Sequence, residues 1–231
     1  MIKLINGDCY KEIKKLEDKS INFIYFNPPF GVSEQLWDNS LDYTKLWDDM
    51  WRVLKPRGVV AIHCSGKFTH SVISTQFKNF KYCWYWDKKC WTGHLRSKVQ
   101  PMRHIEEIAI FYKKGCDINI QRTLRDKPIM LKHSMTNYYN GNRGNSGIKK
   151  ECKYKYPSHY LVYKRRNHKY STRPVDLCEY MIKTYSNEGD TVLDLTMSDA
   201  QSGIACKNLN RDYIGFEIDE TRYNDAVENN S

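Results

Sequence analysis

The stretch INFIYFNPPF, residues 21–30, decides how the rest of this sequence is interpreted. Its first six residues are mostly β-branched or aromatic, a composition that predicts a buried β-strand. The next four are a polar amide, two rigid prolines and an aromatic: Asn27, Pro28, Pro29 and Phe30. In an α/β sheet, functional groups gather beyond the carboxyl ends of strands. The order therefore predicts a strand that carries a polar turn to a functional edge.

This turn is suited to binding a planar exocyclic amine. The side-chain oxygen of Asn27 and a neighbouring main-chain carbonyl can both accept from an amino group, and Phe30 can lie against the ring that carries it. Prolines fix φ and donate no hydrogen bond, so a carbonyl beside them stays available as an acceptor. The alternative is a strand that merely ends in a proline turn, and the other parts of the chain must decide.

Length and composition indicate one sizeable domain with room for an inserted region. The chain has 231 residues, 40% of them hydrophobic, and no apolar stretch approaches the length of a membrane span. The N-terminus lacks the apolar core of a signal peptide. We therefore expect an intracellular protein, cytoplasmic or nucleoid/nuclear, that is not secreted. The eight cysteines are scattered singly, which predicts free thiols and no metal site.

The formal net charge of +10 favours a polyanionic partner, of which nucleic acid is the commonest. Basic residues and tyrosines alternate between about residues 115 and 169, where the hydrophobic periodicity fails. Such a segment suits a surface that follows phosphates and stacks on bases. A disordered polar insertion is the alternative, and the composition of residues 140–147 predicts a flexible loop.

On both sides of this segment, strand and helix patterns alternate, which predicts an α/β fold. A turn at residues 55–58 is expected to stop a helix before the next strand. The predicted strands cover residues 2–5, 21–26, 59–62, 82–86, 105–112, 191–195 and 213–217. The predicted helices lie after residue 9 and at about residues 43–54, 175–185 and 204–209.

Three predicted strands end at an acidic residue: Asp8, Asp194 and Glu217. A strand–loop–helix–strand unit that closes with an acid twenty-odd positions after its loop is the usual arrangement for holding a ribose diol. Glu217 has that position. One such carboxylate alone is explained by a helix cap or a surface charge. Three of them, together with the turn at residues 27–30, predict a nucleoside-binding edge.

In chain order, these motifs resemble the β group of amino DNA methyltransferases, which use S-adenosylmethionine. The resemblance covers nearly the whole chain, from the Gly-Asp-Cys at residues 7–9 and the turn at 27–30 through Leu-Lys-Pro-Arg-Gly at 54–58 to the closing stretch at 189–217. It implies a Rossmann-like class I fold, α/β, with a mixed, mostly parallel seven-stranded sheet, helices on both faces, circular permutation and an irregular inserted recognition region. It also implies a catalytic half at residues 1–114, a target-recognition region at 115–169 and a cofactor-binding half at 170–231.

The resemblance implies methyl transfer from S-adenosylmethionine to adenine N6 in double-stranded DNA, with the base flipped out of the stack. Asn27 and the Pro28 carbonyl would hold N6, Phe30 would stack on the ring, and Asn in the first motif position favours adenine over cytosine. The resemblance implies no metal. It is compatible with a homodimer or with a heterodimer that contains another methyltransferase subunit. The implied cofactor-binding residues are Asp8, Cys9, Ser171, Arg173, Asp194, Thr196, Glu217 and Ile218. The implied DNA-binding residues are Arg96, Lys98, Arg103, Arg143, Lys149, Lys150, Arg165 and Arg166.

The cofactor loop departs from the family pattern. The family has Asp-Pro-Phe-x-Gly-Ser-Gly-Thr-Thr-Gly where residues 194–203 read DLTMSDAQSG, so that Ser198 and Ala200 replace glycines and Asp199 adds an acid. Added Cβ atoms obstruct a close approach of the backbone to a ligand, and glycine adopts positive φ more readily. A second hypothesis therefore stays open: a catalytically inactive, DNA-binding relative that has lost the cofactor and partners an active methyltransferase.

Overall fold

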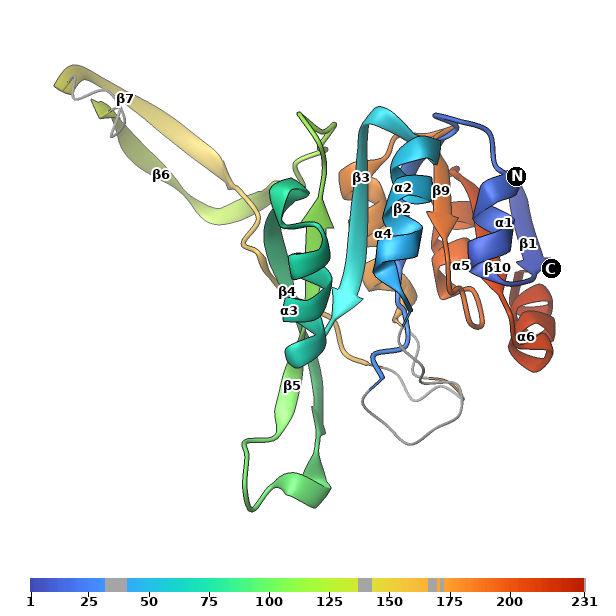
Figure 1. Cartoon of the computed structure of the whole chain (residues 1–231). Coiled ribbons are helices and arrows are strands. Elements are labelled where there is room, and N and C mark those ends of the chain that lie inside the picture. The colour runs from blue at the N-terminus through green and yellow to red at the C-terminus, as the bar shows by residue number, and fades with distance from the viewer. Residues whose placement is uncertain (32–40, 137–142, 166–169, 171–172, 231) are drawn as a thin grey trace. The chain divides into compact units, whose positions relative to one another are not determined.

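The computed structural model describes residues 1–31, 41–136, 143–165, 170 and 173–230 (Figure 1). Its contacts divide the chain into two compact units. The first, Met1–Asn119 with His159–Ser231, contains the main sheet, and the second is Ile120–Ser158. Each unit is described by itself.

In the described part of the chain the main sheet has eight strands, and every pairing from β1 to β3 is parallel. Between β1 and β3 the order is β1, β10, β9, β2, β3, and the β3–β5 and β5–β4 pairs are antiparallel. The expectation of seven strands was wrong by one, because the short β8 pairs parallel with β4 at the outer edge. Three residues are too few to show a period-two pattern. The strands are β1 (Ile2–Asn6), β2 (Ile21–Phe26), β3 (Leu54–Cys64), β4 (Phe80–Thr92), β5 (Arg103–Phe111), β8 (Tyr160–Val162), β9 (Thr191–Asp194) and β10 (Asp212–Glu217).

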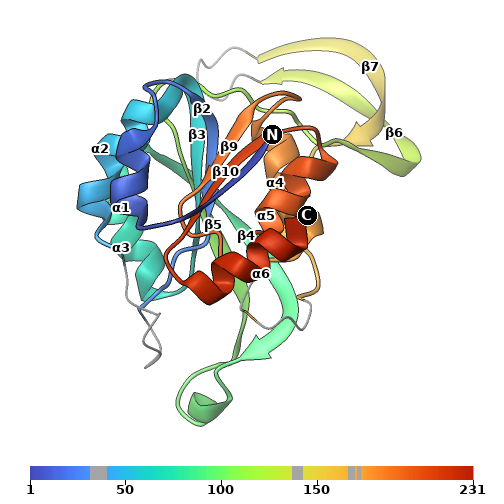
Figure 2. The same ribbon diagram turned by 90° about the vertical axis from the view of Figure 1, so that its right-hand side faces the viewer.

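Helices cover both faces of this sheet, as Figures 1 and 2 show. One face carries α1 (Cys9–Glu12), α2 (Tyr43–Val53) and α3 (Lys67–Thr75). The other carries α4 (Val175–Tyr185), α5 (Gln201–Asn208) and α6 (Glu220–Asn230). Three 3₁₀ turns, η1 (Ile13–Lys15), η2 (Phe77–Asn79) and η3 (His94–Arg96), complete the unit. None of the helices in the described part of the chain has the length and apolar content needed to cross a bilayer.

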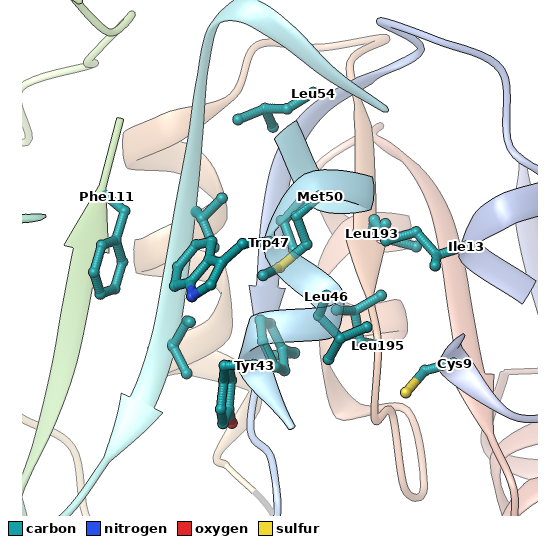
Figure 3. Close-up of a cluster of buried hydrophobic side chains, with 14 of the residues drawn as sticks. Cys9, Ile13, Tyr43, Leu46, Trp47, Met50, Leu54, Phe111, Leu193 and Leu195 are labelled. Carbon is teal, nitrogen blue, oxygen red and sulfur yellow. The ribbon is translucent and has the colours of Figure 1, made fainter. Parts of the chain in front are cut away.

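Strand β2 shows why this sheet is covered on both sides. Ile24 and Phe26 belong to the core cluster under α1, α2 and α3, whereas Phe23 and Tyr25 belong to the cluster under α4, α5 and α6. All four side chains are almost fully buried. An unbroken apolar run is what a strand needs when both of its faces are covered. The first cluster is drawn in Figure 3, where Trp47 of α2 lies between its helix and β3.

The segment at residues 54–58 is extended, not a turn as expected. α2 ends at Val53, and β3 begins at the next residue, Leu54. The pairing register jumps from Ile21–Leu54 to Phe23–Val59, so the Lys-Pro-Arg-Gly stretch forms an irregularity within the strand. A Cβ on Gly58 would lie 2.7 Å from the Asn22 carbonyl oxygen, which explains why glycine fits there.

The second unit is a two-stranded antiparallel sheet of β6 (Thr123–Thr136) and β7 (Arg143–Lys155). The expectation of an irregular region was therefore wrong, and residues 143–147 of the expected flexible loop lie in β7. Residues 140–142 lie outside the described part of the chain. The sequence hid these strands because a two-stranded sheet can expose both faces, so its residues need not alternate between apolar and polar. Leu124 of β6 and Tyr154 of β7, for example, are exposed.

Candidate active site

Neighbouring parallel strands present polar residues at one edge of the main sheet. β2 ends directly before Asn27, β9 ends at Asp194 and β10 ends at Glu217. Because parallel strands finish at the same edge, these residues form a row, and α5 begins just beyond it. Asn27 and Asp194 line a cavity of about 30 Å³, which is room for about one water molecule.

The predicted Asn-Pro-Pro-Phe turn lies beside the cavity at this edge of the sheet. Asn27 is half-buried and lines the cavity, and Pro28 is buried. Phe30 is half-buried and packs against Phe68 of α3, with ring centroids 5.0 Å apart. The core therefore holds the Phe30 ring in place, and Pro28, two positions earlier, is buried as well.

Arg173 occupies the centre of the site. Its side chain is buried, and one guanidinium nitrogen, Nη2, donates to Asn27 Oδ1 and lies 2.7 Å from Glu106 Oε2. Its Nε donates to His63 Nδ1 over 3.0 Å, and its Cζ lies 5.2 Å from the centre of the Trp86 ring. An arginine with these partners is fixed on all sides. It fills the space between the Asn27 turn and the strands β3, β4 and β5.

The protonation of His63 follows from this geometry. An arginine can only donate, so His63 Nδ1 must be the unprotonated nitrogen, and Nε2 donates to Tyr25 Oη over 2.8 Å. Burial, and then the nearby Arg173 charge, hold the pKa of His63 well below its usual value. His63 is therefore neutral at physiological pH.

Glu106 balances the positive charges of the site. Burial alone would raise its pKa, but the Arg173 and Lys88 charges outweigh burial and hold the pKa of Glu106 below its ordinary value. Lys88 Nζ donates to Glu106 Oε1 over 2.9 Å, and both side chains are nearly inaccessible. The carboxylate thus joins two cations that would otherwise repel each other.

The loop at residues 194–203 is held by both strand-end carboxylates. Asp194 accepts from the Thr196 N–H over 3.0 Å and from Ser202 Oγ over 2.6 Å. Glu217 accepts from the Ser198 N–H over 2.9 Å. Burial raises the pKa of Asp194 to about 7 and also raises that of Glu217. The loop backbone is therefore tied to the ends of β9 and β10.

The replaced glycines keep a glycine-like backbone. Ser198 has φ +51° and Ala200 has φ +54°, in the left-handed region that residues with a Cβ rarely occupy. The backbone course that the family's glycines favour is thus retained at both positions, at the expense of local strain.

The residues of this edge fit the polar groups of S-adenosylmethionine, whose sugar diol and ammonium group seek carboxylates and hydroxyls. Two buried hydroxyls beside the cavity, Thr196 Oγ1 and Ser198 Oγ, have no hydrogen-bond partner among the described residues. Buried polar atoms are normally paired, so these two point to a ligand. The cavity of about 30 Å³ is smaller than such a ligand and opens to solvent.

The remaining predicted cofactor residues are only partly brought to this edge. Asp8 caps α1 by accepting from the Tyr10 N–H over 2.9 Å, and Cys9 is buried, which raises its pKa to about 12. β1 pairs with β10, so that Asp8 and Glu217 follow adjacent strands. Ile218 is exposed, and Ser171 lies outside the described residues.

The predicted DNA-binding residues fall into three places. Arg96, Lys98 and Arg103 lie on the hairpin that joins β4 to β5, and all three are exposed. Arg165 follows β8 and is half-buried, with its N–H donating to the Lys88 carbonyl. Arg166 lies outside the described residues. Three others are on β7 of the second unit: Arg143, Lys149 and Lys150.

Residue patterns alone missed three members of the site: His63, Trp86 and Lys88. His63 follows the predicted strand at residues 59–62, so a polar residue at the carboxyl end of a buried strand was the available signal. Glu106 lies on the predicted strand at residues 105–112 and was given no role from the sequence. Its partners Lys88 and Arg173 are distant in sequence, and nothing local pairs them.

Comparison with protein families matches residues 21–228 to the family model for DNA methylase. The type II methyltransferase M.HpaI of Haemophilus parainfluenzae is 28% identical over 235 aligned positions, which cover 94% of this chain and 70% of that protein.

Two of the solved structures that resemble this chain illustrate the shared fold. That of the M1.HpyAVI–SAM complex has a TM-score of 0.62 at 21% identity and covers 99% of this chain and 98% of its own. That of the PvuII DNA methyltransferase, which is cytosine-N4-specific, has a TM-score of 0.67 at 15% identity and covers 98% and 85%.

Proposed function

This chain belongs to the DNA methylase family, and from the chemistry of its site we propose that it methylates the N6 amino group of adenine in duplex DNA. S-adenosylmethionine is the methyl donor and supplies an electrophilic methyl group on a sulfonium. The observation that carries the proposal is the position of Asn27, whose side chain lines the same cavity as the loop held by Asp194. An acceptor for an amine and a nucleoside-binding loop therefore meet at one edge.

In this proposal the protein acts mainly by positioning. Asn27 Oδ1 and the Pro28 carbonyl accept from the target amino group, which directs its lone pair towards the methyl group, and Phe30 lies against the base. Holding two reactants in a near-attack geometry supplies a large part of the acceleration. We propose that Asp8 and Glu217 contact the nucleoside part of the cofactor, and that Asp194 and Thr196 contact its methionine end. Cys9, Ser171 and Ile218 are proposed to flank it.

Arg173 has a different proposed role from the one that the family resemblance implied. Its buried side chain contacts Asn27, Glu106 and His63. Because a guanidinium only donates, it must face Asn27 Oδ1, and a flipped amide would bring two donors together. We propose that Arg173 fixes the amide so that the second lone pair of Oδ1 faces the target.

The second unit, with residues around it from 115 to 169, is proposed to recognise the target sequence. A two-stranded β-ribbon fits the major groove, and β7 carries the basic residues Arg143, Lys149 and Lys150. We propose that these three, with Arg96, Lys98, Arg103, Arg165 and Arg166, contact the DNA. We propose that a protein with this substrate acts inside the cell, in the cytoplasm or at the nucleoid or nucleus.

Methyl transfer tests the function directly. Purified protein is incubated with S-adenosylmethionine tritiated on the methyl group and genomic DNA that lacks N6-methyladenine, and the digested nucleosides are separated. Tritium in N6-methyldeoxyadenosine is the expected result, and tritium only in N4-methyldeoxycytidine would contradict the adenine assignment. We expect Asn27→Ala to lower transfer by about 10²-fold or more while leaving cofactor affinity within about threefold, because the amide contacts the base and not the cofactor.

Two observations favour a second candidate, a DNA-binding subunit without catalysis. The cavity holds little more than a water molecule, and the strained loop lacks the family's glycines. Calorimetry with S-adenosylmethionine separates the two functions, because micromolar binding supports the enzyme and no heat at millimolar ligand supports the inactive subunit. Assembly as a homodimer or heterodimer is proposed from the family resemblance alone, and sedimentation with and without duplex DNA tests it.

A further inference from the structure

Strands β4 and β5 continue beyond the rest of the main sheet as a hairpin. β3 pairs with β5 only up to Glu107, and β8 pairs with β4 only up to Asp87. Beyond these points the two strands pair only with each other, to Thr92 and Arg103. In Figures 1 and 2 this hairpin stands out from the sheet at the end where β3 finishes. We call residues 88–104 the projecting hairpin.

The charge of the projecting hairpin is entirely positive. Its sequence contains five lysines and arginines and no acidic residue. Lys88 and Lys89 are paired with Glu106 and Asp87 at the base of the hairpin. By contrast Arg96, Lys98 and Arg103 form no ion pair with any carboxylate in the described part of the chain. Unpaired cations on an extended element match a phosphate backbone.

Apolar side chains are exposed on the same element. Leu95 is 103% exposed, Val99 83% and Trp91 53%. Trp91 packs on His104, with ring centroids 4.2 Å apart, and this aromatic pair stiffens the strands below the tip. All of residues 94–101 are exposed, so the apolar tip is not part of a core formed by the described residues. Proteins that kink DNA insert apolar side chains of this kind between base steps.

The base of the projecting hairpin is part of the active site. Glu106 follows it on β5 and contacts Arg173, which donates to Asn27, and Lys88 at its other end contacts Glu106. The Asp87–Ile105 and Thr92–Arg103 pairs lie two residues apart on β5, or roughly 7 Å at about 3.3 Å per residue, and residues 93–102 continue the hairpin beyond them. A duplex that delivers a base to Asn27 therefore lies within reach of the tip.

We propose that the projecting hairpin enters a groove of the target duplex, where Leu95 and Val99 contact the base stack beside the extruded nucleotide. Arg96 and Lys98 neutralise phosphates on either side of the groove. A flipped base leaves an apolar gap in the stack, and a branched aliphatic side chain can fill it and keep the base from returning. This inference rests on the proposed function and assigns a partner surface to it.

The test compares Leu95→Ser and Arg96→Ala with the matched control Phe77→Ser. Phe77 is 74% exposed on η2, before the start of β4 and therefore at the opposite end of that strand. The probe is a duplex built on the sequence that the wild-type protein methylates, with 2-aminopurine in place of the target adenine. We expect Leu95→Ser to lower the fluorescence increase at saturating protein, and kcat/KM by about tenfold. Arg96→Ala should weaken binding and its salt dependence without changing the saturated fluorescence, and Phe77→Ser should match the wild type.

The outcomes separate this inference from the proposed function. Wild-type methylation with unchanged fluorescence and kcat/KM for Leu95→Ser overturns the hairpin role and leaves the function standing. If the wild type transfers no methyl group, the 2-aminopurine assay is replaced by fluorescence anisotropy, which measures affinity for a mixed-sequence duplex. Equal affinities for wild type, Leu95→Ser and Arg96→Ala would then overturn the hairpin role, and weaker binding by both variants would support it. Leu95-dependent binding to vesicles of equal parts phosphatidylcholine and phosphatidylserine, without binding to DNA, would overturn it in favour of a membrane surface.

Discussion

At the scale of single residues, the buried contacts of Arg173 decide what Asn27 can do. A primary amide has a donor end and an acceptor end of nearly the same shape, and only its partners determine which end faces a ligand. Arg173 donates to Asn27 Oδ1, and Glu106 holds the arginine in place from the other side. The acceptor end is thereby fixed before any base arrives, which removes an orientation that would not bind an amino group.

Arg173→Met and Arg173→Lys separate this positioning role from cofactor binding. We expect Arg173→Met to lower kcat for methyl transfer by about 10- to 100-fold with a change of less than about threefold in the dissociation constant of S-adenosylmethionine. Arg173→Lys should restore part of the loss, because an ammonium can still donate to Asn27 Oδ1. A parallel loss of kcat and cofactor affinity in Arg173→Met would instead support the cofactor contact that the family resemblance implied.

Asp194 gives the free energy of unfolding a dependence on pH. Burial raises its folded-state pKa to about 7, against an ordinary value of 3.8. Between these two pH values the folded state binds more protons than the unfolded state, so stability falls as pH rises from about 4 to about 7 and then levels off. Glu217, whose pKa burial also raises, acts in the same direction.

Urea denaturation between pH 5 and pH 8 measures this effect. We expect the wild-type free energy of unfolding to fall relative to that of Asp194→Asn by roughly a few kcal/mol on going from acid to neutral pH, because His63, whose folded-state pKa is lowered, opposes the fall equally in both proteins. Asp194→Asn should flatten that fall, because its side chain is never charged. The carboxyls with lowered pKa, Asp87 and Glu106, titrate below this window and do not obscure it. An identical slope in the variant would show that Asp194 is already ionised in the folded protein at acid pH.

At the scale of elements, the loop that follows β9 stores strain at the two positions where the family has glycine. Replacing Ser198 and Ala200 by glycine removes Cβ atoms from a left-handed backbone, which relieves about 1 kcal/mol or more at each position, partly offset by the entropy of glycine in the unfolded chain. We expect the double variant to bind S-adenosylmethionine about tenfold more tightly by calorimetry, because the backbone can then approach the ligand.

The matched control for this loop is Lys19→Gly. Lys19 also has a positive φ, +52°, but it precedes β2, on the far side of that strand from Asn27. The Lys19→Gly variant should lose the same small backbone strain and bind S-adenosylmethionine as tightly as the wild type. A cofactor affinity that is unchanged in the double glycine variant would contradict the assignment of this loop to the ligand.

Elements with a clear hydrophobic pattern were predictable from the sequence. The strand at Ile21–Phe26 and the helix at Val175–Tyr185 were predicted with the bounds that the structure has, because each buries a continuous face. α6 was missed because Ala226 is its only buried residue among those described, so it has no apolar stripe. The exposed ribbon of β6 and β7 was missed for the same physical reason.

The candidate site was predictable only where function lies at strand ends. Asn27, Asp194 and Glu217 could be placed together from the sequence, since parallel strands finish at one edge. The contacts of Arg173 with Glu106 and His63 could not, because they join residues 67 and 110 positions apart and depend on the antiparallel β5 and on β3. Sequence spacing carries no information about such side-chain contacts.

At the scale of the whole molecule, an excess of ten positive charges predicts binding to duplex DNA that weakens steeply with salt. Each phosphate that a lysine or arginine neutralises contributes about −0.9 to the slope of log K against log salt concentration. Replacing Arg143, Lys149 and Lys150 of β7 by alanine should therefore reduce the slope by up to about three. A triple variant of equal charge, Lys55→Ala, Lys78→Ala and Lys183→Ala, removes exposed lysines at the sheet end opposite Asn27. Fluorescence anisotropy with a fluorescein-labelled mixed-sequence duplex measures both. If the two variants lose affinity and slope equally, net charge alone binds the DNA, and the second unit has no recognition role of its own.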